Sequence, residues 1–377
     1  MSKPRILIFS VAYEPLVGGA ELAVRNITDR LFGYEFDLIT CRFDRHHKAE
    51  EKIGNVNVYR VGFGSRIGRM LWPVLAYRLA RKLQRERNYK IVWSIMAAYA
   101  GAAGLLFKRR NPEVKFLLTL QEGDSIGHIH SKVRGFKRKW QTVFRQADYI
   151  QAISNFLADW AKSEGARCPV AVVPNGVDAE RFKNREYRIE NRENFFTIIT
   201  VSRLVYKNGL DTLIRAAVEL KTHILHSTFY IQILGSGPEE SNLKKLTAVL
   251  KVQDQVRFLG NVSQAELPNY LANADIFVRA SRSEGLGTAF LEAMAAGLPI
   301  VGTAVGGIPD FLTDQKTGLF TEVDDPKDLA RKIRSLVDDA ELRKRLAENG
   351  RRIVEEKYNW DIIASQMDRI FKFLISN

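Results

Sequence analysis

The sequence predicts an α/β protein with two doubly wound domains, each built around a parallel β-sheet. Short apolar runs alternate with amphipathic segments along almost the whole chain, which is the pattern of repeated strand–helix units. At 377 residues the chain is too long for one ordinary core and fits two domains of similar size. The charged segment 181–193 is typical of a linker, so we expect one domain over residues 1–187 and another over 188–359.

The first domain opens with a strand, a glycine loop and a helix, which together form the first unit of a doubly wound sheet. Residues 5–11 are an apolar run typical of a buried parallel strand, a loop with Gly18 and Gly19 follows, and a helix is predicted over 20–31. Ser154 is expected to cap a helix that ends at residue 162. The other strands predicted in this half are 36–40, 56–61, 91–96, 116–121, 147–152 and 170–173.

The second domain is predicted from the same alternation. Its first strand covers 195–201 and its first helix 210–220, and two polar helices are expected within 328–357. Further strands are predicted at 230–234, 256–259, 276–279 and 300–301, with a helix at 288–296. The last helix, 360–375, has an apolar face made of Ile363, Met367, Ile370 and Leu374.

The composition is that of a globular protein, with 46% hydrophobic and 27% charged residues. Cys41 and Cys168 give neither a disulfide framework nor a metal pattern, and the six histidines form no ligand cluster. Residues 91–107 are apolar, but they are fewer than the roughly 20 that a membrane-spanning helix needs, so we predict a strand and a buried helix there. The first residues lack a signal-peptide profile, and a reducing cytoplasm is the expected compartment.

The excess positive charge belongs to the first half of the chain. Residues 1–190 carry 33 Lys and Arg against 19 Asp and Glu, whereas residues 191–377 carry 24 of each. Such asymmetry indicates that the first half faces something anionic, such as a membrane, a nucleic acid or a charged acceptor. We do not expect a nucleic acid, because the sequence holds no recognition motif for one.

Two basic amphipathic segments, residues 66–90 and 132–145, lie in this half. The first has eight basic residues and one acidic residue, and the second has six basic residues and none acidic. We hypothesise that these helices contact the anionic inner face of the membrane, while the alternative is two ordinary helices with apolar side chains inward and arginine in water. Their apolar residues are Leu71, Leu75, Leu79 and Leu83 in the first, and Phe136, Trp140 and Phe144 in the second.

The most informative stretch covers residues 283–307. Gly285 and Gly287 let the backbone approach a ligand, and the helix that follows offers N–H groups to an anion such as a phosphate. Glu284 lies at the mouth of this loop and Glu292 about two helical turns beyond it, so both carboxylates can accept hydrogen bonds from hydroxyl groups. A phosphate between two polyhydroxyl groups is a sugar nucleotide. The alternative is a glycine turn with two solvated glutamates.

Two other loops carry candidate ligand groups. Arg203 and Lys207 follow a predicted strand next to a helix start, where two cations would neutralise a diphosphate, while the alternative is two exposed basic side chains. Glu122, Asp124 and His128 follow another predicted strand, at the end where doubly wound sheets bind ligands. The alternative for that segment is a solvated loop.

Taken together, these segments resemble the retaining glycosyltransferases of family 4, which have the GT-B fold. The likeness extends over nearly the whole chain and rests on the order and spacing of short motifs. It implies two Rossmann-like domains that face each other across a cleft, with residues 360–377 crossing back to the first domain. The motifs are Gly18-Gly19-Ala20-Glu21, Pro174-Asn175-Gly176-Val177-Asp178, Ser202-Arg203, Lys207-Asn208-Gly209, Phe258-Leu259-Gly260, Ser283-Glu284-Gly285, Glu292-Ala293-Met294-Ala295, Gly306-Gly307-Ile308-Pro309-Asp310 and Thr317-Gly318-Leu319.

The resemblance also implies roles for single residues. Arg203 and Lys207 would hold the donor diphosphate, Glu284 would bind the transferred hexose, and Glu292 would bind the ribose hydroxyls. Neither a metal nor a cofactor is then expected, because the two cations can stabilise the leaving diphosphate. Retention is explained in this family by attack on the same face of the sugar, without a protein nucleophile. Further donor contacts would come from Gly18, Gly19, Asn261, Val262, Gly285, Leu286, Gly287 and Thr288.

One loop departs from the family pattern. Many relatives carry a histidine directly after the strand equivalent to 116–120, whereas Gln121, Glu122 and Asp124 occupy this loop here and His128 comes later. We expect Glu122, Asp124 and His128 on the acceptor side, and the change indicates a different acceptor.

We therefore predict an enzyme that transfers a hexosyl group from a UDP- or GDP-sugar to a saccharide or lipid-linked acceptor, in cell-envelope or exopolysaccharide synthesis. The basic first half would bind the acceptor and the neutral second half the donor. Two other functions fit the sequence: a nucleotide-sugar epimerase of similar fold, and a saccharide-binding protein that has lost catalysis.

Overall fold

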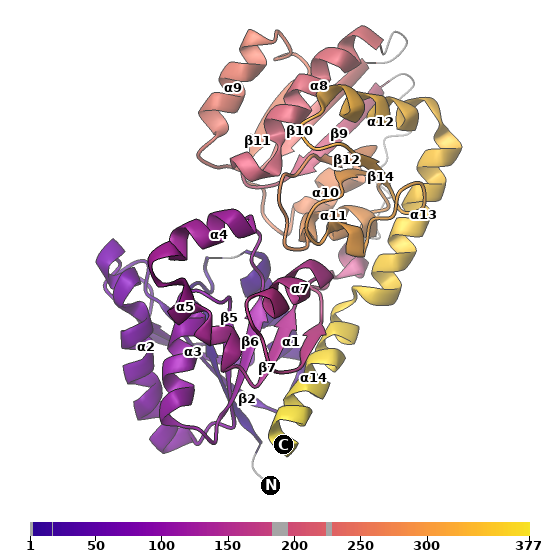
Figure 1. Cartoon of the computed structure of the whole chain (residues 1–377). Coiled ribbons are helices and arrows are strands. Elements are labelled where there is room, and N and C mark those ends of the chain that lie inside the picture. Colours follow the sequence, from indigo (N-terminus) through magenta and orange to yellow (C-terminus); the bar gives the residue numbers. More distant parts are fainter. Residues whose placement is uncertain (1–2, 17, 183–194, 224–227) are drawn as a thin grey trace. The chain divides into compact units, whose positions relative to one another are not determined.

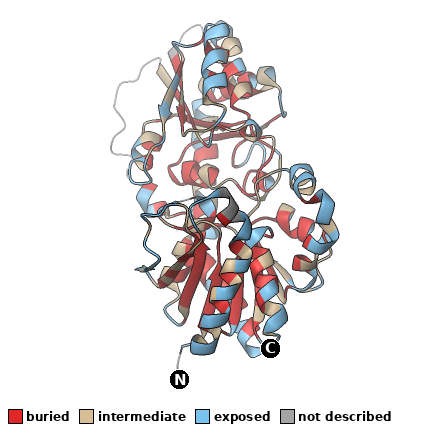
Figure 2. Cartoon of the chain, turned by 90° about the vertical axis from the view of Figure 1, so that its left-hand side faces the viewer, coloured by how far each residue is buried: buried red, intermediate tan, exposed pale blue. Residues whose placement is uncertain are grey.

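The computed structural model describes residues 3–16, 18–182, 195–223 and 228–377 (Figure 1). The contacts group the chain into two compact units, which we call unit 1 (Met1–Asn175 with Trp360–Asn377) and unit 2 (Gly176–Asn359). The predicted boundary between residues 187 and 188 lies outside the described residues. Both units are α/β, and Figure 2 shows the strands of each sheet as largely buried and the outer faces of the helices as exposed.

Unit 1 contains an eight-stranded sheet in the order β3-β4-β2-β1-β5-β6-β7-β8. Every strand predicted in the first half of the sequence is present. The sequence reasoning missed β3, which pairs antiparallel with β4 at the sheet edge, because this charged and largely exposed strand carries no apolar signal. The strands are β1 Arg5–Phe9, β2 Glu35–Cys41, β3 Glu50–Ile53, β4 Val56–Val61, β5 Ile91–Ile95, β6 Lys115–Leu120, β7 Tyr149–Ala152 and β8 Val170–Val172.

Helices cover both faces of this sheet, and the alternation along β1 shows which helices lie on each face. Ile6 and Ile8 enter a core shared with α1 and α14, which lie side by side (Figure 1). Phe9 points to the other face and packs against Trp72 of α2 and Phe107 of α3, with ring centroids 6.3 Å apart in each pair. The helices of unit 1 are α1 Gly19–Arg30, α2 Arg66–Arg87, α3 Tyr99–Arg110, α4 Ile126–Val133, α5 Lys137–Trp140, α6 Thr142–Arg145, α7 Asn155–Ser163 and α14 Trp360–Ser376.

The last helix packs on the first domain, as the family resemblance implied. The predicted apolar face of α14 is at most 4% exposed at each of its four positions. Phe371 of the same helix contacts the rings of Tyr34, Phe36 and Trp93, which belong to the sheet of unit 1 or to the turn before β2. Burial of this face therefore fixes the end of the chain to unit 1.

Helix α2 forms as predicted, but its buried face is not the leucine row. Trp72, Ala76 and Ala80 are fully buried, whereas Leu71 is 49% exposed and only Leu83 of the predicted row is buried. The buried row is shifted because Trp72 fills the space beside Phe9, and because alanine is small enough to let the helix approach the sheet closely.

The second basic segment is not one amphipathic helix, contrary to the prediction for residues 132–145. It is divided among the end of α4, the 3₁₀ turn η1 (Arg134–Phe136), α5 and α6. Trp140 and Phe144 are buried against Trp160, with centroids 5.9 and 5.3 Å from its ring, and Phe136 remains exposed. Tertiary packing of the aromatic rings has therefore overridden the regular spacing.

Unit 2 contains a six-stranded sheet in the order β11-β10-β9-β12-β13-β14, and its described pairs are parallel. The predicted strands and helices of this half are present. The strands are β9 Phe195–Val201, β10 Thr228–Leu234, β11 Val256–Gly260, β12 Ile276–Arg279, β13 Ile300–Thr303 and β14 Leu319–Thr321. The helices are α8 Leu210–His223, α9 Glu240–Val249, α10 Leu267–Ala272, α11 Thr288–Ala295, α12 Pro326–Asp338 and α13 Ala340–Lys357, with the 3₁₀ turns η2 Ala179–Phe182, η3 Tyr206–Asn208 and η4 Ile308–Asp310.

The apolar stretch at residues 91–107 folds as predicted, into the buried strand β5 and the first part of α3. Within the described part of the chain, no helix combines the length and the hydropathy needed to cross a membrane.

Candidate functional site

The strand order of unit 2 reverses between β9 and β12. From this point β10 and β11 extend to one side, and β13 and β14 extend to the other. The loops after β9 and β12 therefore leave the same sheet edge in opposite directions, which is where open α/β sheets bind ligands. These two loops, residues 202–209 and 280–287, contain the predicted cations and the first predicted glutamate.

Two glycines allow the loops to pack closely. Gly209 has φ +64°, and a Cβ atom there would lie 1.7 Å from the carbonyl oxygen of Ala280. Gly306, at φ +57°, would place a Cβ atom 1.8 Å from the carbonyl oxygen of Glu284. Any larger residue at either position would force the loops apart. The glycines thus hold the loops after β9 and β13 against the loop after β12.

Glu284 is buried, with 6% exposure, and lies in a polar cluster. Its Oε1 atom forms an ion pair with Nη2 of Arg279 and accepts a hydrogen bond of 3.3 Å from the hydroxyl of Ser281. Arg279 also donates to Oδ1 of Asn208 at 3.1 Å, and the side-chain amide of Asn208 donates to the backbone oxygen of Arg203 at 2.7 Å. This cluster joins the two loops at the point where the strand order reverses.

Arg203 and Lys207 lie at the carboxyl end of β9, Arg203 in the loop just after the strand and Lys207 inside the turn η3. The side chain of Arg203 is exposed and that of Lys207 is half-buried. Two hydrogen bonds from Arg282 hold this turn. The backbone N–H of Arg282 donates to the carbonyl oxygen of Lys207 at 2.7 Å, and the Arg282 side chain donates to the carbonyl oxygen of Tyr206 at 2.6 Å. Arg282 is fixed in turn by Asp211 at 2.8 Å.

Glu292 lies inside α11 and is 8% exposed. Burial raises the pKa of its carboxyl from 4.5 to about 7, and the positive charges of Arg181 and Arg279 and a hydrogen bond from Gln264 oppose this rise. Both glutamates are buried, which contradicts the alternative of two solvated carboxylates. The helix begins at Thr288, as predicted, so only residues 288–292 of the stretch between the two glutamates are helical.

The glycine loop connects these two acids. Gly285 and Leu286 are buried, and Gly287 is the N-cap of α11 with φ +93°. A Cβ atom on Gly287 would lie 3.9 Å from the carboxyl carbon of Glu284, so the loop and the carboxylate are neighbours. The helix start at Thr288 and the first glutamate therefore lie together, as expected for a site that takes a phosphate and a hydroxyl group.

Asn261 and Val262 follow β11, two strands away from β9. The Asn261 side chain is exposed and its Oδ1 atom accepts a hydrogen bond of 2.9 Å from Ser236. The N–H of Gly235 donates to the carbonyl oxygen of Gly260 at 2.7 Å, which ties the ends of β10 and β11 together. These residues lie at the same carboxyl edge as the loops described above.

In unit 1, Gly18 and Gly19 lie at the start of α1, after β1. The strand order of this sheet also reverses there, between β1 and β5. The N–H of Gly18 donates to the carboxylate of Glu21 at 2.8 Å. Burial raises the pKa of that carboxyl.

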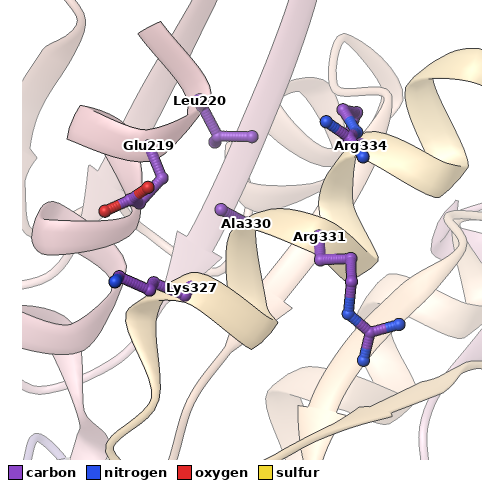
Figure 3. A pocket seen from close by; sticks show the side chains of 6 residues that line it. All are labelled: Glu219, Leu220, Lys327, Ala330, Arg331 and Arg334. Atoms are coloured by element: carbon purple, nitrogen blue, oxygen red, sulfur yellow. The ribbon is translucent and has the colours of Figure 1, made fainter. Parts of the chain in front are cut away.

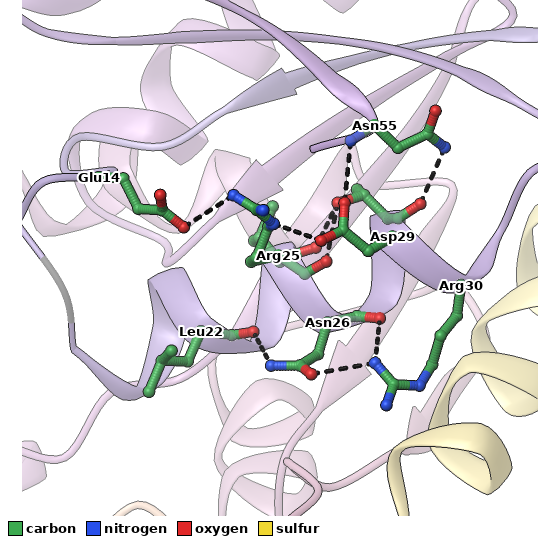
Figure 4. A network of polar contacts seen from close by, with 9 residues as sticks. Glu14, Leu22, Arg25, Asn26, Asp29, Arg30 and Asn55 are labelled. Atoms are coloured by element: carbon green, nitrogen blue, oxygen red, sulfur yellow. Dashed lines mark hydrogen bonds and ion pairs between the residues drawn. The ribbon is translucent and has the colours of Figure 1, made fainter. Parts of the chain in front are cut away.

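A polar network holds α1 in place (Figure 4). Arg25 contacts the carboxylate of Glu14 at 3.0 Å in the loop after β1 and also pairs with Asp29. Asp29 accepts from the backbone N–H of Asn55 at 2.9 Å, in the turn between β3 and β4, as Figure 4 shows. The network therefore fixes the helix that begins at Gly19 and has Gly18 as its N-cap, the two predicted phosphate-binding glycines.

The predicted acceptor-side residues fall into two groups. Glu122 turns inward, and its Oε1 atom accepts from the N–H of Ala97 at 2.7 Å, while its Oε2 atom is buried without a partner among the residues that the structure describes. Burial raises the pKa of this carboxyl to about 7. Asp124 lies at the surface near His128 and Lys132, at 4.0 and 3.4 Å. The alternative of a solvated loop fits Asp124 and His128 but not Glu122.

The sequence reasoning missed Arg279, Asn208 and Ser281, which surround Glu284. One signal could have revealed Arg279, since a charged residue at the end of an otherwise apolar strand must find a buried partner. Asn208 belongs to a motif of the family resemblance, but neither its side chain nor that of Ser281 could be assigned a role, because asparagine and serine are common in loops.

A separate hollow of about 270 Å³ lies between α8 and α12 in unit 2 (Figure 3). It contains none of the residues predicted to bind the donor. Figure 3 shows its lining residues, which are Glu219, Leu220, Lys327, Ala330, Arg331 and Arg334. In the part of the chain that the structure describes, no three His, Cys, Asp or Glu side chains are placed to hold a metal ion, and metal independence stays a prediction.

Two family descriptions match the chain in succession. Residues 17–181 match Glycosyltransferase Family 4, and residues 182–353 match Glycosyl transferases group 1. The GDP-mannose-dependent alpha-(1-6)-phosphatidylinositol monomannoside mannosyltransferase of Mycobacterium tuberculosis is 27% identical, over 96% of this chain and 97% of that protein.

Solved structures share the fold. Sucrose-phosphate synthase of Thermosynechococcus elongatus aligns with a TM-score of 0.86 and 20% identity, over 99% of this chain and 100% of the other. HepE of Anabaena, solved with UDP and glucose, aligns with a TM-score of 0.79 and 20% identity, over 98% of this chain and 99% of the other. These alignments confirm the predicted GT-B architecture.

Proposed function

The chain belongs to glycosyltransferase family 4, and we propose that it moves a hexosyl group, with retention, from a UDP- or GDP-sugar to a saccharide or lipid-linked acceptor. We place the donor on unit 2 and the acceptor on unit 1. The observation that carries the proposal is the carboxyl edge of the unit 2 sheet, where the loops after β9 and β12 bring the turn with Arg203 and Lys207 next to Glu284.

The chemistry of this edge suits a sugar nucleotide. Arg203 and Lys207 would neutralise the diphosphate, and their charge would stabilise the leaving group as the bond from the sugar C1 to its oxygen breaks. Glu284 would accept a hydrogen bond from a sugar hydroxyl, and Glu292 would do the same for the ribose. The acceptor oxygen would bond to C1 on the same face, while its proton passes to an oxygen of the leaving diphosphate.

The names of similar proteins support the substrate classes. The mycobacterial relative is named for GDP-mannose and a phosphatidylinositol mannoside, and the HepE structure holds UDP and glucose. Both nucleotides therefore remain in the proposal. A lipid-linked acceptor also agrees with the charge of residues 1–190, and we place the reaction in cell-envelope or exopolysaccharide synthesis.

The test is a thermal-shift screen of the purified chain with UDP-glucose, UDP-N-acetylglucosamine, GDP-mannose and ADP-glucose. A bound donor at 100 times its dissociation constant adds about 2.7 kcal/mol to the stability of the folded state, so the melting temperature should rise for one of the UDP- or GDP-sugars. Absence of any shift, or a shift with ADP-glucose alone, contradicts the proposed donors.

A further inference from the structure

Arg279 is a buried arginine at the end of β12. The three residues before it in the strand are fully buried apolar side chains, and Arg279 itself is 8% exposed. A guanidinium group keeps its charge at any ordinary pH, so burying it is unfavourable unless the surrounding groups compensate the charge. The contacts of Arg279 therefore indicate what its charge is used for.

Those contacts reach both loops of the unit 2 site. The Nη2 atom pairs with Oε1 of Glu284 and lies 3.1 Å from Oδ1 of Asn208, and the guanidinium carbon lies 5.7 Å from the ring centre of Phe290 in α11. The Nε atom is buried and makes no hydrogen bond to a residue that the structure describes. Arg279 thus joins the two loops of the site. It contacts Glu284, the carboxylate for which we propose a hydrogen bond to the sugar.

Two contacts of the Glu284 carboxylate converge on the same oxygen. The ion pair with Arg279 and the 3.3 Å hydrogen bond from Ser281 both go to Oε1 of Glu284. The Oε2 atom takes part in neither contact and belongs to a carboxyl group next to the N-cap of α11. One oxygen is therefore fixed by the protein, and the other is left to accept a hydroxyl group.

We infer that Arg279 is a positioning residue for Glu284, which fixes one oxygen of that carboxylate and directs the second oxygen to a hydroxyl of the donor sugar. This inference rests on the proposed function. The arginine acts on the sugar through Glu284 and need not touch the diphosphate. The turn η3, with Lys207, has other supports, including the 2.7 Å bond from the Asn208 side chain to the oxygen of Arg203 and the 3.1 Å bond from the Asn208 N–H to the oxygen of Val205.

The experiment compares a nucleotide sugar with its nucleoside diphosphate. The dissociation constants of UDP and UDP-glucose, and of GDP and GDP-mannose, are measured by calorimetry for the native chain and for Arg279→Met, Glu284→Gln and the double variant. We expect Arg279→Met to weaken the sugar nucleotide about 10-fold or more, as for loss of a charged hydrogen bond, and the diphosphate less than about 3-fold. Glu284→Gln should show the same selectivity, and the double variant should bind no worse than the weaker single variant.

Two further variants distinguish a positioning role of Arg279 from a general loss of stability. Arg279→Lys keeps the charge but cannot contact Glu284 and Asn208 with one planar group, so it should lose sugar nucleotide affinity selectively and by less than Arg279→Met. Arg343→Met is the control, because Arg343 bonds the carbonyl oxygens of Leu336 and Val337, at 2.5 and 2.8 Å, away from the site. It should leave the ratio of the two affinities unchanged.

The possible outcomes separate the two proposals. Equal losses for the diphosphate and the sugar nucleotide in the Arg279 variants, or additive losses in the double variant, would overturn the role of Arg279 while leaving the proposed function standing. A native chain that binds neither nucleotide sugar would overturn both. If Arg279→Met does not fold, the selectivity of Arg279→Lys decides the matter.

Discussion

At the scale of single residues, Lys207 and Glu284 should affect different parts of the donor. Lys207 is expected to contact the diphosphate, so Lys207→Ala should weaken UDP or GDP by about 1.5–3 kcal/mol, the range for a hydrogen bond to a charged group. Lys244→Ala is a matched control, because Lys244 is an exposed lysine of unit 2 that pairs with Glu240 at 2.6 Å. Calorimetry with the nucleoside diphosphate measures both variants, and equal effects would contradict the role of Lys207.

Glu284→Ala should abolish sugar transfer while the chain still binds the nucleoside diphosphate. The reason is that Glu284 is proposed to contact the transferred sugar, whereas Arg203 and Lys207 contact the phosphates. Product formation with the donor identified by the thermal-shift screen is the measurement. A variant that retains transfer at the native rate would remove Glu284 from the mechanism.

The stability of the protein should depend on pH through Glu292. Burial raises the pKa of its carboxyl from 4.5 to about 7, so the folded state binds this proton more tightly than the unfolded state. The resulting stabilisation is present below about pH 4.5 and is lost as pH rises through about 7, and it amounts to about 3 kcal/mol at most. Glu292→Gln removes this dependence.

Melting temperatures without nucleotide at pH 5 and pH 8 test this point. The native protein should be less stable relative to Glu292→Gln at pH 8 than at pH 5. Glu122, whose pKa is raised in the same direction, is present in both proteins and cancels in the comparison. A constant difference between native and variant would show that Glu292 has no raised pKa.

The residue scale also shows how far the sequence could predict the site. Glu284 and Glu292 could be predicted because carboxylates near a glycine loop and a helix start have a specific chemistry. Their burial is compensated in part by the positive charges of Arg279 and Arg181, which come from other parts of the chain. Such contacts join residues of different strands, loops and helices, so the local spacing of residues does not predict them.

At the scale of elements, α2 presents an apolar end that is largely exposed to solvent. Met70, Leu71 and Val74 are 66%, 49% and 44% exposed, and Phe63 in the loop before the helix is 67% exposed. The outer face of the same helix carries exposed Arg78, Arg81, Lys82 and Arg85. Apolar side chains beside a row of cations suit an anionic membrane surface, so we propose that α2 contacts such a surface.

Co-sedimentation with vesicles tests the role of α2. The native chain should bind vesicles that contain phosphatidylglycerol more strongly than vesicles of phosphatidylcholine alone. Leu71→Asp should reduce this binding several-fold, whereas Val249→Asp should not, because Val249 is an apolar residue of unit 2 that is even more exposed, at 77% against 49%. Binding without preference for the anionic lipid would contradict the proposal.

Elements were predicted well where one periodicity dominated. The buried face of α14 is the one that the spacing of its apolar residues predicted, because α14 is a long helix packed along one side of unit 1. The segment 132–145 did not, since Trp140 donates a hydrogen bond of 3.1 Å to the oxygen of Ala97 and packs inward with Phe144. Short helices shaped by such contacts cannot be predicted from spacing alone.

At the scale of the whole molecule, the two units differ in net charge and in the functional groups that they carry. The excess of basic residues lies within residues 1–190, and the cluster around Glu284 lies in unit 2. This division agrees with an acceptor held by one unit and a donor held by the other. It also explains why length, charge and motif order predicted the architecture, while the identity of the acceptor depends on surface loops of unit 1.

The most direct measurement is a crystal structure of the chain with a 2-fluoro analogue of the UDP- or GDP-sugar that the screen identifies, since the fluorine slows transfer and keeps the donor whole. We predict that the diphosphate lies within about 3 Å of the Arg203 and Lys207 side chains, at hydrogen-bond distance, and that a sugar hydroxyl donates to Glu284. A donor bound elsewhere, or bound there with Glu284 turned away from the sugar, would contradict the account.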